Sequence, residues 1–568
     1  MTALGASETS AQQAAAGGQT AATATITVRA DREIGRIDRH IYGHFLESAF
    51  FGNIEGGVFD EGSPLSLAEP GARNGLRRDV IEACRELGVP IVRWPGGNFT
   101  SSYHWEDGIG PRDSRPRRLD LNWGDEESNR FGTDEFLAWC SEVGAEPYLV
   151  HSCRDVEEAV RWVEYTNYAG DTEQTRRRAD NGHPDPYRVR YWGVGNEVYG
   201  PWQMGNRSPE EHAAAAREHA RFMRLVDPSL QLIAVGAPRL HGARWNQERW
   251  TQALLEQAGN LFDYVSLHLY GASTHLYTTT PHDEYDAVVA QSLHFEREIA
   301  DYSDLVCSLA QKSGVERPLS LTLDEWTMRH LEPADWPQPL PCADGGAAPR
   351  DLTPVSQRPR LRVNRWSPRT LADALFYAGV FHGLHRLSGR PVAPRMANTV
   401  NLVNANALIV ARERGVVKAS TYHVWDLYQN HLGPVAAPVE VDAPARWGQL
   451  RLGDQRNSAG GFHTRGASIP CLDAVATRSE DGTALQLAVI NRHRSDAVTA
   501  QIRLDGHAAG LPPTAHLREL GTGVTDVMAT NSFDAPGAVA LQDRGVVKVE
   551  SGAHTFPAHS VTLLSFDL

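Results

Sequence analysis

Two glutamates in short polar motifs have the clearest chemical potential in this sequence. Glu197 follows Asn196 in WGVGNE, and Glu325 follows Asp324 in LDEW. Each motif comes after a short apolar run that predicts a strand. Two carboxylates that face each other over a cleft suit glycoside hydrolysis, in which one protonates the leaving oxygen and the other stabilises or attacks the anomeric carbon. Either dipeptide alone is more typical of a helix N-cap or a surface pair, so the interpretation depends on both.

The SLHLY motif places His268 and Tyr270 between the two glutamates, and a strand would put both side chains on one face. They could face a reaction site, although hydrogen-bonded core residues give the same pattern. We expect the amide of Asn196 to donate to the sugar hydroxyl beside the reacting carbon. A second carboxylate nearby should keep the catalytic acid protonated by raising its pKa.

Two alternatives use the same residues differently. His44, His268 and Glu197 could form a zinc set, but the sequence contains no HExxH or CxxC motif. We therefore predict no metal and no cofactor. Glu47 could be a buried salt-bridge partner of Arg93 rather than a ligand-binding residue.

Short apolar strands alternate with amphipathic helices over about 350 residues, which predicts an α/β fold of the (β/α)₈ barrel type. A doubly wound sheet would usually carry a GxGxxG loop after its first strand, and that motif is missing there. The reactive groups of such barrels lie at the carboxyl ends of the strands. The predicted strands span residues 41–46, 91–94, 147–150, 191–194, 232–235, 264–269, 319–323 and 392–396.

The pattern divides the chain into four parts. Residues 1–24 are rich in Ala and Gly and predict a disordered tail, and the strand within 25–40 is expected to join a C-terminal sheet. Residues 41–397 form the predicted barrel. Residues 398–568, with short alternating segments bounded by Gly, Pro and Asp, predict an all-β sandwich of the jelly-roll type. The Pro- and Gly-rich insertion at 335–360 is expected to shape a pocket.

The composition limits which binding partners and which cellular location are expected. The chain of 568 residues carries a formal charge of −15, which argues against nucleic acid or an anionic membrane as partner. The six cysteines form no metal-ligand spacing, and the N-terminal residues contain neither a basic nor an apolar signal region. No run of 18 apolar residues occurs. We expect a cytoplasmic protein.

Taken in order, IYGHFLE, RWPGGNF, WGVGNE, SLHLY and LDEW resemble the glycoside hydrolase family 51 α-L-arabinofuranosidases. The resemblance implies a retaining enzyme with a barrel and a C-terminal β-sandwich, without a metal, intracellular and often hexameric. It implies that Glu197 is the acid/base and Glu325 the nucleophile. The other implied roles are sugar binding by Glu47, Asn98 and Asn196, orientation of the carboxylates by His268 and Tyr270, and an aromatic pocket wall at Trp123.

Two positions depart from the family pattern. Arg329 stands where the family commonly has Trp, and Asn401 aligns with a Gln that contacts the exocyclic hydroxyl of the sugar. These changes would widen the pocket, unless Arg329 points to solvent and the insertion at 335–360 refills the space. The sequence thus predicts an exo-acting retaining enzyme that releases terminal α-L-arabinofuranosyl residues. A β-D-galactofuranosidase, a catalytically silent carbohydrate-binding homologue and a metal-dependent hydrolase are the alternatives.

Overall fold

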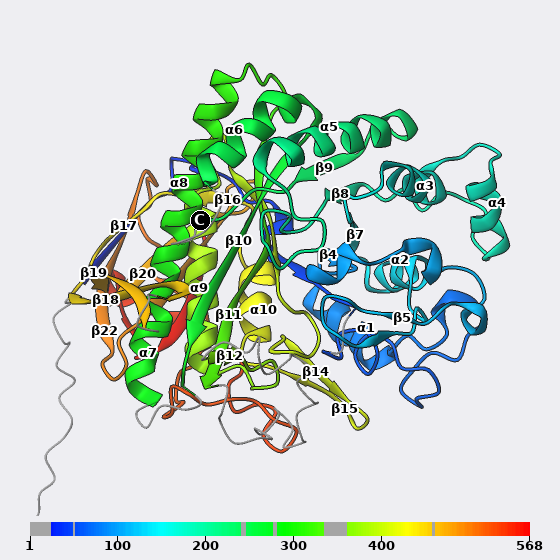
Figure 1. The fold of residues 1–568 in the computed structure, drawn as a ribbon. Helices are drawn as coiled ribbons and strands as arrows, with labels where there is room; N and C mark the ends of the chain where they lie inside the picture. The colour runs from blue at the N-terminus through cyan, green and yellow to red at the C-terminus, as the bar shows by residue number, and fades with distance from the viewer. Residues whose placement is uncertain (1–23, 49–50, 240–245, 276–280, 334–360, 457–460) are drawn as a thin grey trace, which may run out of the picture.

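The computed structural model describes residues 24–48, 51–239, 246–275, 281–333, 361–456 and 461–568 (Figure 1). The tail predicted up to residue 24 lies outside these residues except for its last position. The insertion predicted at 335–360 lies outside them entirely.

Within the described residues, eight parallel strands close into a barrel, as predicted. The strands follow one another around the ring in chain order, and the last pairs with the first. A short antiparallel strand, β12 (Leu361–Val363), extends the sheet at β11. The barrel strands are β3 (Gly43–Phe45), β4 (Ile91–Trp94), β7 (Glu146–His151), β8 (Tyr191–Val194), β9 (Gln231–Ala234), β10 (Tyr264–Ser273), β11 (Ser320–Pro333) and β13 (Pro394–Thr399).

Six of these strands differ from their predicted ranges, and three of the differences have a clear structural cause. The first was expected from residue 41, but Arg39–Tyr42 form a 3₁₀ turn capped by the Asp38 side chain. β10 and β11 continue past their predicted ends because they go on pairing with each other as far as Ser273 and His330. The two longest barrel strands therefore rise together above the ring.

Amphipathic helices surround the barrel. Typical cap signals define their ends: α5 starts with a capping box at Ser208 and Glu211, and α1 stops at Gly88, where φ is +74°. The segment from 281 to 312 forms two helices that meet at Ala290. The helices are α1 (Arg78–Leu87), α2 (Thr133–Val143), α3 (Val156–Asn167), α4 (Glu173–Asp180), α5 (Pro209–Val226), α6 (Gln247–Ala258), α7 (Pro281–Val289), α8 (Gln291–Lys312), α9 (Leu371–Arg386) and α10 (Tyr422–His431).

The C-terminal region forms two sheets with a shared apolar core, on one side of the barrel (Figure 1). Ile26 and Ile502 belong to one sheet, and Leu487 and Phe566 to the other. The four-stranded sheet has the order β17 (Val439–Asp442), β1 (Ala24–Arg29), β22 (Val498–Asp505), β25 (Ala553–Phe556). The seven-stranded sheet has the order β2 (Gly35–Arg36), β16 (Val435–Ala437), β20 (Leu472–Arg478), β21 (Ala484–Asn491), β26 (Ser560–Asp567), β23 (Thr514–Leu520), β24 (Gln542–Lys548).

Three two-stranded sheets complete the fold: β5 (Arg118–Leu119) with β6 (Glu126–Glu127), β14 (Ile409–Arg412) with β15 (Gly415–Lys418), and β18 (Ala445–Arg456) with β19 (Phe462–Pro470). The β18–β19 hairpin lies against α8 and β10. Its Arg451 donates to the carbonyl of Ala272 at 2.6 Å and pairs with Glu284. A strand pair of the C-terminal region is thereby fixed at the barrel mouth.

Candidate active site

One pocket at the carboxyl ends of the barrel strands contains most of the predicted site residues. It has a volume of about 80 Å³. The predicted residues that line it are Glu47, Asn98, Trp123, Glu197, Tyr270, Glu325 and Asn401. His268 lies beside Glu197 and lines an adjoining pocket, whereas Asn196 is buried behind the wall. The structure therefore brings together the residues predicted to act in catalysis or sugar binding.

A bulge in β11 determines how Glu325 faces the pocket. Between the pairs Ser266–Thr322 and His268–Glu325, β11 contains one residue more than β10, and it shows the same excess against β13. Strand side chains otherwise alternate, so Asp324 and Glu325 would point to opposite faces. The extra residue lets both carboxylates point into the barrel, because a bulge re-aims the side chains around it.

The buried guanidinium of Arg93 connects these carboxylates. It donates to Glu325 Oε1 at 2.9 Å and to Asn196 Oδ1 at 2.7 Å, and its Nε lies 3.8 Å from Asp324. The alternative that pairs Glu47 with Arg93 is therefore wrong. Glu325 also accepts a hydrogen bond from the Tyr270 hydroxyl. Two fixed donors thus hold the carboxylate of Glu325.

Glu197 lies across the pocket from Glu325, two residues beyond Gly195 at the end of β8. Its backbone is in the left-handed region, with φ of +44°, which is uncommon for a residue with a side chain. Its carboxylate accepts hydrogen bonds from Trp202 Nε1 at 2.8 Å and the Tyr199 hydroxyl at 3.2 Å. Carboxylate oxygens of Glu197 and Glu325 lie within 4.8 Å of each other.

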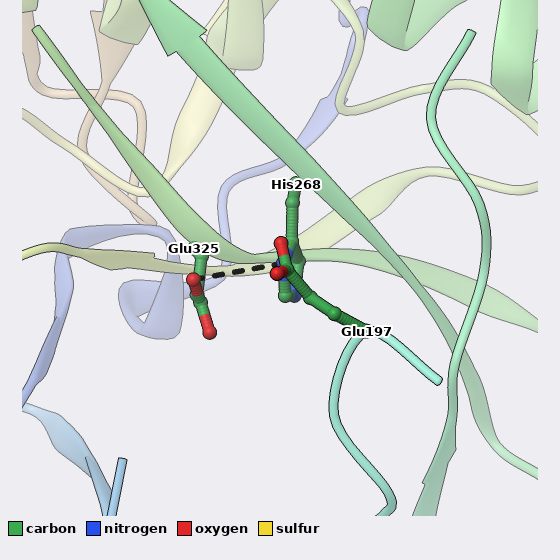
Figure 2. Close-up of side chains that lie close together, drawn as sticks. All are labelled: Glu197, His268 and Glu325. Carbon is green, nitrogen blue, oxygen red and sulfur yellow. Dashed lines mark hydrogen bonds and ion pairs between the residues drawn. The ribbon is translucent and has the colours of Figure 1, made fainter. Parts of the chain in front are cut away.

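His268 stands between the acidic residues (Figure 2). Its Nδ1 is 2.9 Å from Glu197 Oε1, and its Nε2 is 3.0 Å from Asp324 Oδ1. Burial works to lower the pKa of His268, but the charges of Glu325 and Asp324 outweigh it and raise the pKa to about 10. The imidazole is therefore a cation at neutral pH.

This cation reverses one expectation about Glu197. Burial works to raise the pKa of Glu197, but the hydrogen bond and charge of His268, with the N–H of Trp202, lower it overall. The sequence predicted a raised pKa, because it considered the second carboxylate and not the imidazolium. In the free protein the proton of this pair therefore lies on His268.

Glu47 forms the opposite wall. Its Oε1 accepts from the backbone N–H of Phe99 at 3.1 Å and from Trp123 Nε1 at 3.2 Å. Burial and the charge of Glu325 raise the pKa of Glu47 to about 7 despite these donors. Close to neutral pH, Glu47 can therefore both accept and donate hydrogen bonds to a bound hydroxyl.

The two positions that depart from the family pattern also lie at this pocket. Arg329 does not point to solvent: its guanidinium carbon lies 3.4 Å from the Tyr270 ring centroid, and Nη1 is 2.6 Å from Asp454 Oδ2. Asn401 donates to the carbonyl of Ala405 at 3.1 Å, and its buried Oδ1 has no partner among the described residues. That oxygen is an available acceptor for a ligand.

Sequence reasoning missed the observed roles of several site residues. Asp324 was quoted only within a motif, and Arg93 was considered only as a partner of Glu47. Their contacts show that Asp324 fixes His268 and that Arg93 fixes Glu325. Arg365 lines the pocket, with its guanidinium carbon 5.0 Å from the Trp123 ring centroid. No local sequence signal marks Arg365, because it lies far along the chain from Trp123.

Glu197, His268 and Glu325 are also the group best placed to hold a metal ion among the described residues. His44, a member of the alternative zinc set, is fully buried and packs against Trp425, with ring centroids 5.6 Å apart. His268 could bind a metal only after losing a proton that its acidic neighbours retain. The cationic Arg93 beside Glu325 adds further repulsion. The donor set therefore fits a metal poorly.

A barrel with two carboxylates facing each other at its mouth defines a glycoside hydrolase. Residues 83–288 match the family described as Alpha-L-arabinofuranosidase 1 domain, and residues 344–560 match the Alpha-L-arabinofuranosidase C-terminal domain. The chain is 32% identical to Alpha-L-arabinofuranosidase C of Emericella nidulans, over 95% of this chain and 96% of that protein. It therefore belongs to the α-L-arabinofuranosidases, and the solved relatives include members of glycoside hydrolase family 51.

Two further relatives extend this comparison. An intracellular exo-α-(1→5)-L-arabinofuranosidase of Halalkalibacterium halodurans is 31% identical over 84% of this chain and 87% of that one. The α-L-arabinofuranosidase of Thermotoga maritima, solved with arabinose, superimposes with a TM-score of 0.78 at 33% identity, covering 96% of this chain and 100% of that chain. No helix in the described residues has the length and apolar character to cross a membrane.

Proposed function

We propose that this protein is an exo-acting, retaining α-L-arabinofuranosidase that works by double displacement. The observation that supports this most directly is the approach of Glu197 and Glu325, whose oxygens lie within 4.8 Å. Retaining glycosidases hold their carboxyl groups about 5–5.5 Å apart, whereas inverting ones leave roughly 6.5–9.5 Å for a water molecule. The names of the family relatives support L-arabinofuranose as the sugar that is released.

In the first step, Glu325 attacks the anomeric carbon while Arg93 and Tyr270 hold its carboxylate. The bond from that carbon to the glycosidic oxygen breaks, and the oxygen leaves with a proton from Glu197. Substrate binding moves this proton from His268 Nδ1 to Glu197 across their hydrogen bond. In the second step Glu197 deprotonates a water molecule, which displaces Glu325 from the anomeric carbon with net retention.

The remaining pocket residues bind the sugar in this proposal. Glu47 and Asn196 hydrogen-bond ring hydroxyls, as does Asn98, and Trp123 supplies an apolar wall. Asn401 contacts the exocyclic carbon. A pocket of this small size, closed by side chains from several strands, suits a terminal sugar rather than the interior of a chain.

A mechanism-based 2-fluoro arabinofuranoside tests the nucleophile. Fluorine at C2 slows hydrolysis of the glycosyl-enzyme, so the labelled peptide can be identified by mass spectrometry. We expect the peptide that contains Glu325 to carry the sugar. A label on another peptide would exclude Glu325, and an inverted product in a reaction followed by NMR would exclude double displacement.

A β-D-galactofuranosidase is the second candidate, favoured by one observation: the short side chain of Asn401 leaves its Oδ1 buried without a described partner. The two furanoses share ring configuration, and the galactofuranose has one additional hydroxymethyl group. One methylene in a pocket changes discrimination by roughly 10–200-fold. The ratio of kcat/KM for aryl α-L-arabinofuranoside and β-D-galactofuranoside decides between them, and Asn401→Gln should shift it towards arabinofuranoside.

Activity on either substrate would exclude a silent binding homologue, and activity retained in EDTA would exclude a metal-dependent hydrolase. We further propose a cytoplasmic location, supported by the relative named as intracellular. We also propose a homo-oligomer of six copies, which the family resemblance implies. The division of the chain at residues 24, 40 and 397 stays a prediction, although α10, beyond 397, packs on α9 and α1 as part of the helical ring.

A further inference from the structure

A second pocket, of about 300 Å³, adjoins the first and shares four of its residues: Asn98, Glu197, Tyr270 and Arg329. Glu197 therefore stands between the two pockets. If Glu197 protonates the leaving oxygen, as proposed above, the leaving group occupies the second pocket. The inference below rests on that proposed function and concerns how this pocket selects the leaving group.

Arg329 lies at the junction of the two pockets and is held on two sides. Its guanidinium stacks on the Tyr270 ring at 3.4 Å from the centroid, and Nη1 donates to Asp454 Oδ2 at 2.6 Å. This is the sole hydrogen bond of Arg329 among the described residues, and 31% of its side chain is exposed. Because a guanidinium has five N–H groups in a fixed plane, the others are available to a ligand in the cleft.

Asp454 belongs to the β18–β19 hairpin of the C-terminal region, and its position is fixed. The preceding Gly453 has φ of +69°, and an added Cβ would lie 2.7 Å from the Tyr270 carbonyl oxygen. Only glycine permits this close approach. On the other side, Gln455 donates to the carbonyl of Arg239 at 3.1 Å. The hairpin therefore presents the carboxylate to Arg329 with little freedom.

The charges around the second pocket indicate an uncharged ligand. Arg239 lies 3.3 Å from Asp301, and Arg329 is paired with Asp454, so each arginine has an acidic partner. Trp202, which is 49% exposed, lines the same pocket and offers an indole surface suited to the apolar face of a sugar ring. A neutral, hydroxyl-bearing sugar matches paired donors beside an aromatic surface.

We propose that Asp454 is a positioning residue that fixes Arg329 over Tyr270, so that Arg329 donates hydrogen bonds to the hydroxyls of a neutral sugar leaving group. The C-terminal hairpin thereby sets the preference for a sugar over an aryl leaving group. An aryl leaving group has no hydroxyls to accept these hydrogen bonds. Cleavage of an aryl glycoside should therefore not depend on Asp454 and Arg329.

The test compares α-1,5-linked L-arabinobiose with 4-nitrophenyl α-L-arabinofuranoside as substrates of Asp454→Ala, Arg329→Ala and the double variant. For each single variant we expect kcat/KM on arabinobiose to fall about tenfold or more relative to the aryl substrate. The loss should appear mainly in KM, because these contacts bind the substrate as well as the transition state. The double variant should be no worse than Arg329→Ala, because Asp454 acts through Arg329.

Asp286→Asn is the matched control. Asp286 forms an ion pair with Arg446 of the same hairpin, and neither residue lines the two pockets. This control should leave the substrate ratio unchanged, and Asp454→Asn repeats the test with a side chain of similar volume in case the alanine variant unfolds.

An unchanged ratio in both Asp454 variants, an equal loss on both substrates, or additive losses in the double variant would overturn the proposal. The wild-type rate on the aryl substrate reports separately on the proposed function. If the protein does not cleave the aryl arabinofuranoside but does cleave galactofuranosides, the same comparison is made with a galactofuranosyl disaccharide and an aryl β-D-galactofuranoside.

Discussion

Nδ1 of His268 lies 2.9 Å from Oε1 of Glu197, and both side chains are buried at the barrel mouth. The pair is linked on its far side to Asp324 through Nε2 of the same imidazole. This chain of three groups retains a proton close to the glycosidic oxygen even though the pKa of Glu197 itself is lowered. In the proposed mechanism, the acid is thus the pair rather than a single carboxyl group.

His268→Asn should move the alkaline limb of the kcat/KM profile to lower pH. In the native protein the pair loses its last proton as pH rises through the pKa of His268, about 10. An asparagine amide can still donate to Glu197 but supplies no proton, so Glu197 must titrate by itself, at lower pH. Tyr199→Phe, which removes a neutral donor to Glu197, is the control and should shift the limb much less. An unmoved limb in His268→Asn contradicts the shared proton.

Glu197→Ala should reduce kcat/KM on poor leaving groups by about 10²–10⁴-fold and on an activated aryl furanoside by far less, since a good leaving group needs no proton. Azide should restore turnover by attacking the glycosyl-enzyme, and the glycosyl azide should keep the α configuration of the substrate. NMR of the product checks the configuration. Equal impairment on both leaving groups, without azide rescue, would show that Glu197 is not the acid/base.

Glu47→Gln should stabilise the fold at high pH and not at low pH. The pKa of Glu47 is raised to about 7 in the folded protein, so between about pH 4.5 and 7 the folded state binds more protons than the unfolded state. Its contribution is fully favourable below that window and is lost as pH rises through 7. Urea unfolding should show Gln exceeding wild type at pH 8 by on the order of 2–3 kcal/mol more than at pH 4. If the stability difference between Glu47→Gln and wild type does not change with pH, the raised pKa of Glu47 is refuted.

Arg93→Met should lower the free energy of unfolding by about 3–5 kcal/mol, because it removes one of the two buried cations beside Glu325 and Asp324 and leaves His268 as the other. Arg29→Met offers the contrast: its ion pair with Glu440 is exposed, so solvent screens it and its loss should change stability far less. Urea denaturation of both variants at neutral pH gives the comparison. Similar losses in the two would mean that Arg93 does not hold the carboxylates together.

The barrel and most of the site could be predicted because they depend on local patterns. Alternation of strands and helices gave the fold, and Glu197 and Glu325 follow apolar runs that end at one face. The extra residue in β11 could not be predicted, since a period-two pattern would send Asp324 and Glu325 to opposite sides. That bulge explains how Asp324 and Glu325 both face the interior of the barrel.

Other errors arose from contacts between distant parts of the chain. The pKa of Glu197 depends on His268, 71 residues away, and the place of Arg329 depends on Asp454, 125 residues away. Neither partner is marked by spacing or composition. The same limit applies to the partner of Arg93: the sequence left Glu47 open as an alternative, and the structure pairs Arg93 with Glu325.

Strand β1 has a consequence for how the chain is made. Ile26 pairs in register with Ile502, and Val28 with Leu504, so the central strand pair of one C-terminal sheet joins the two ends of the described chain. A ribosome releases the first partner long before the second. The barrel can therefore assemble while β1 still lacks its neighbours, and its apolar face must be kept from other strands until β17 and β22 have been made. Production of this enzyme should accordingly be sensitive to conditions that slow translation of the residues between the barrel and β22.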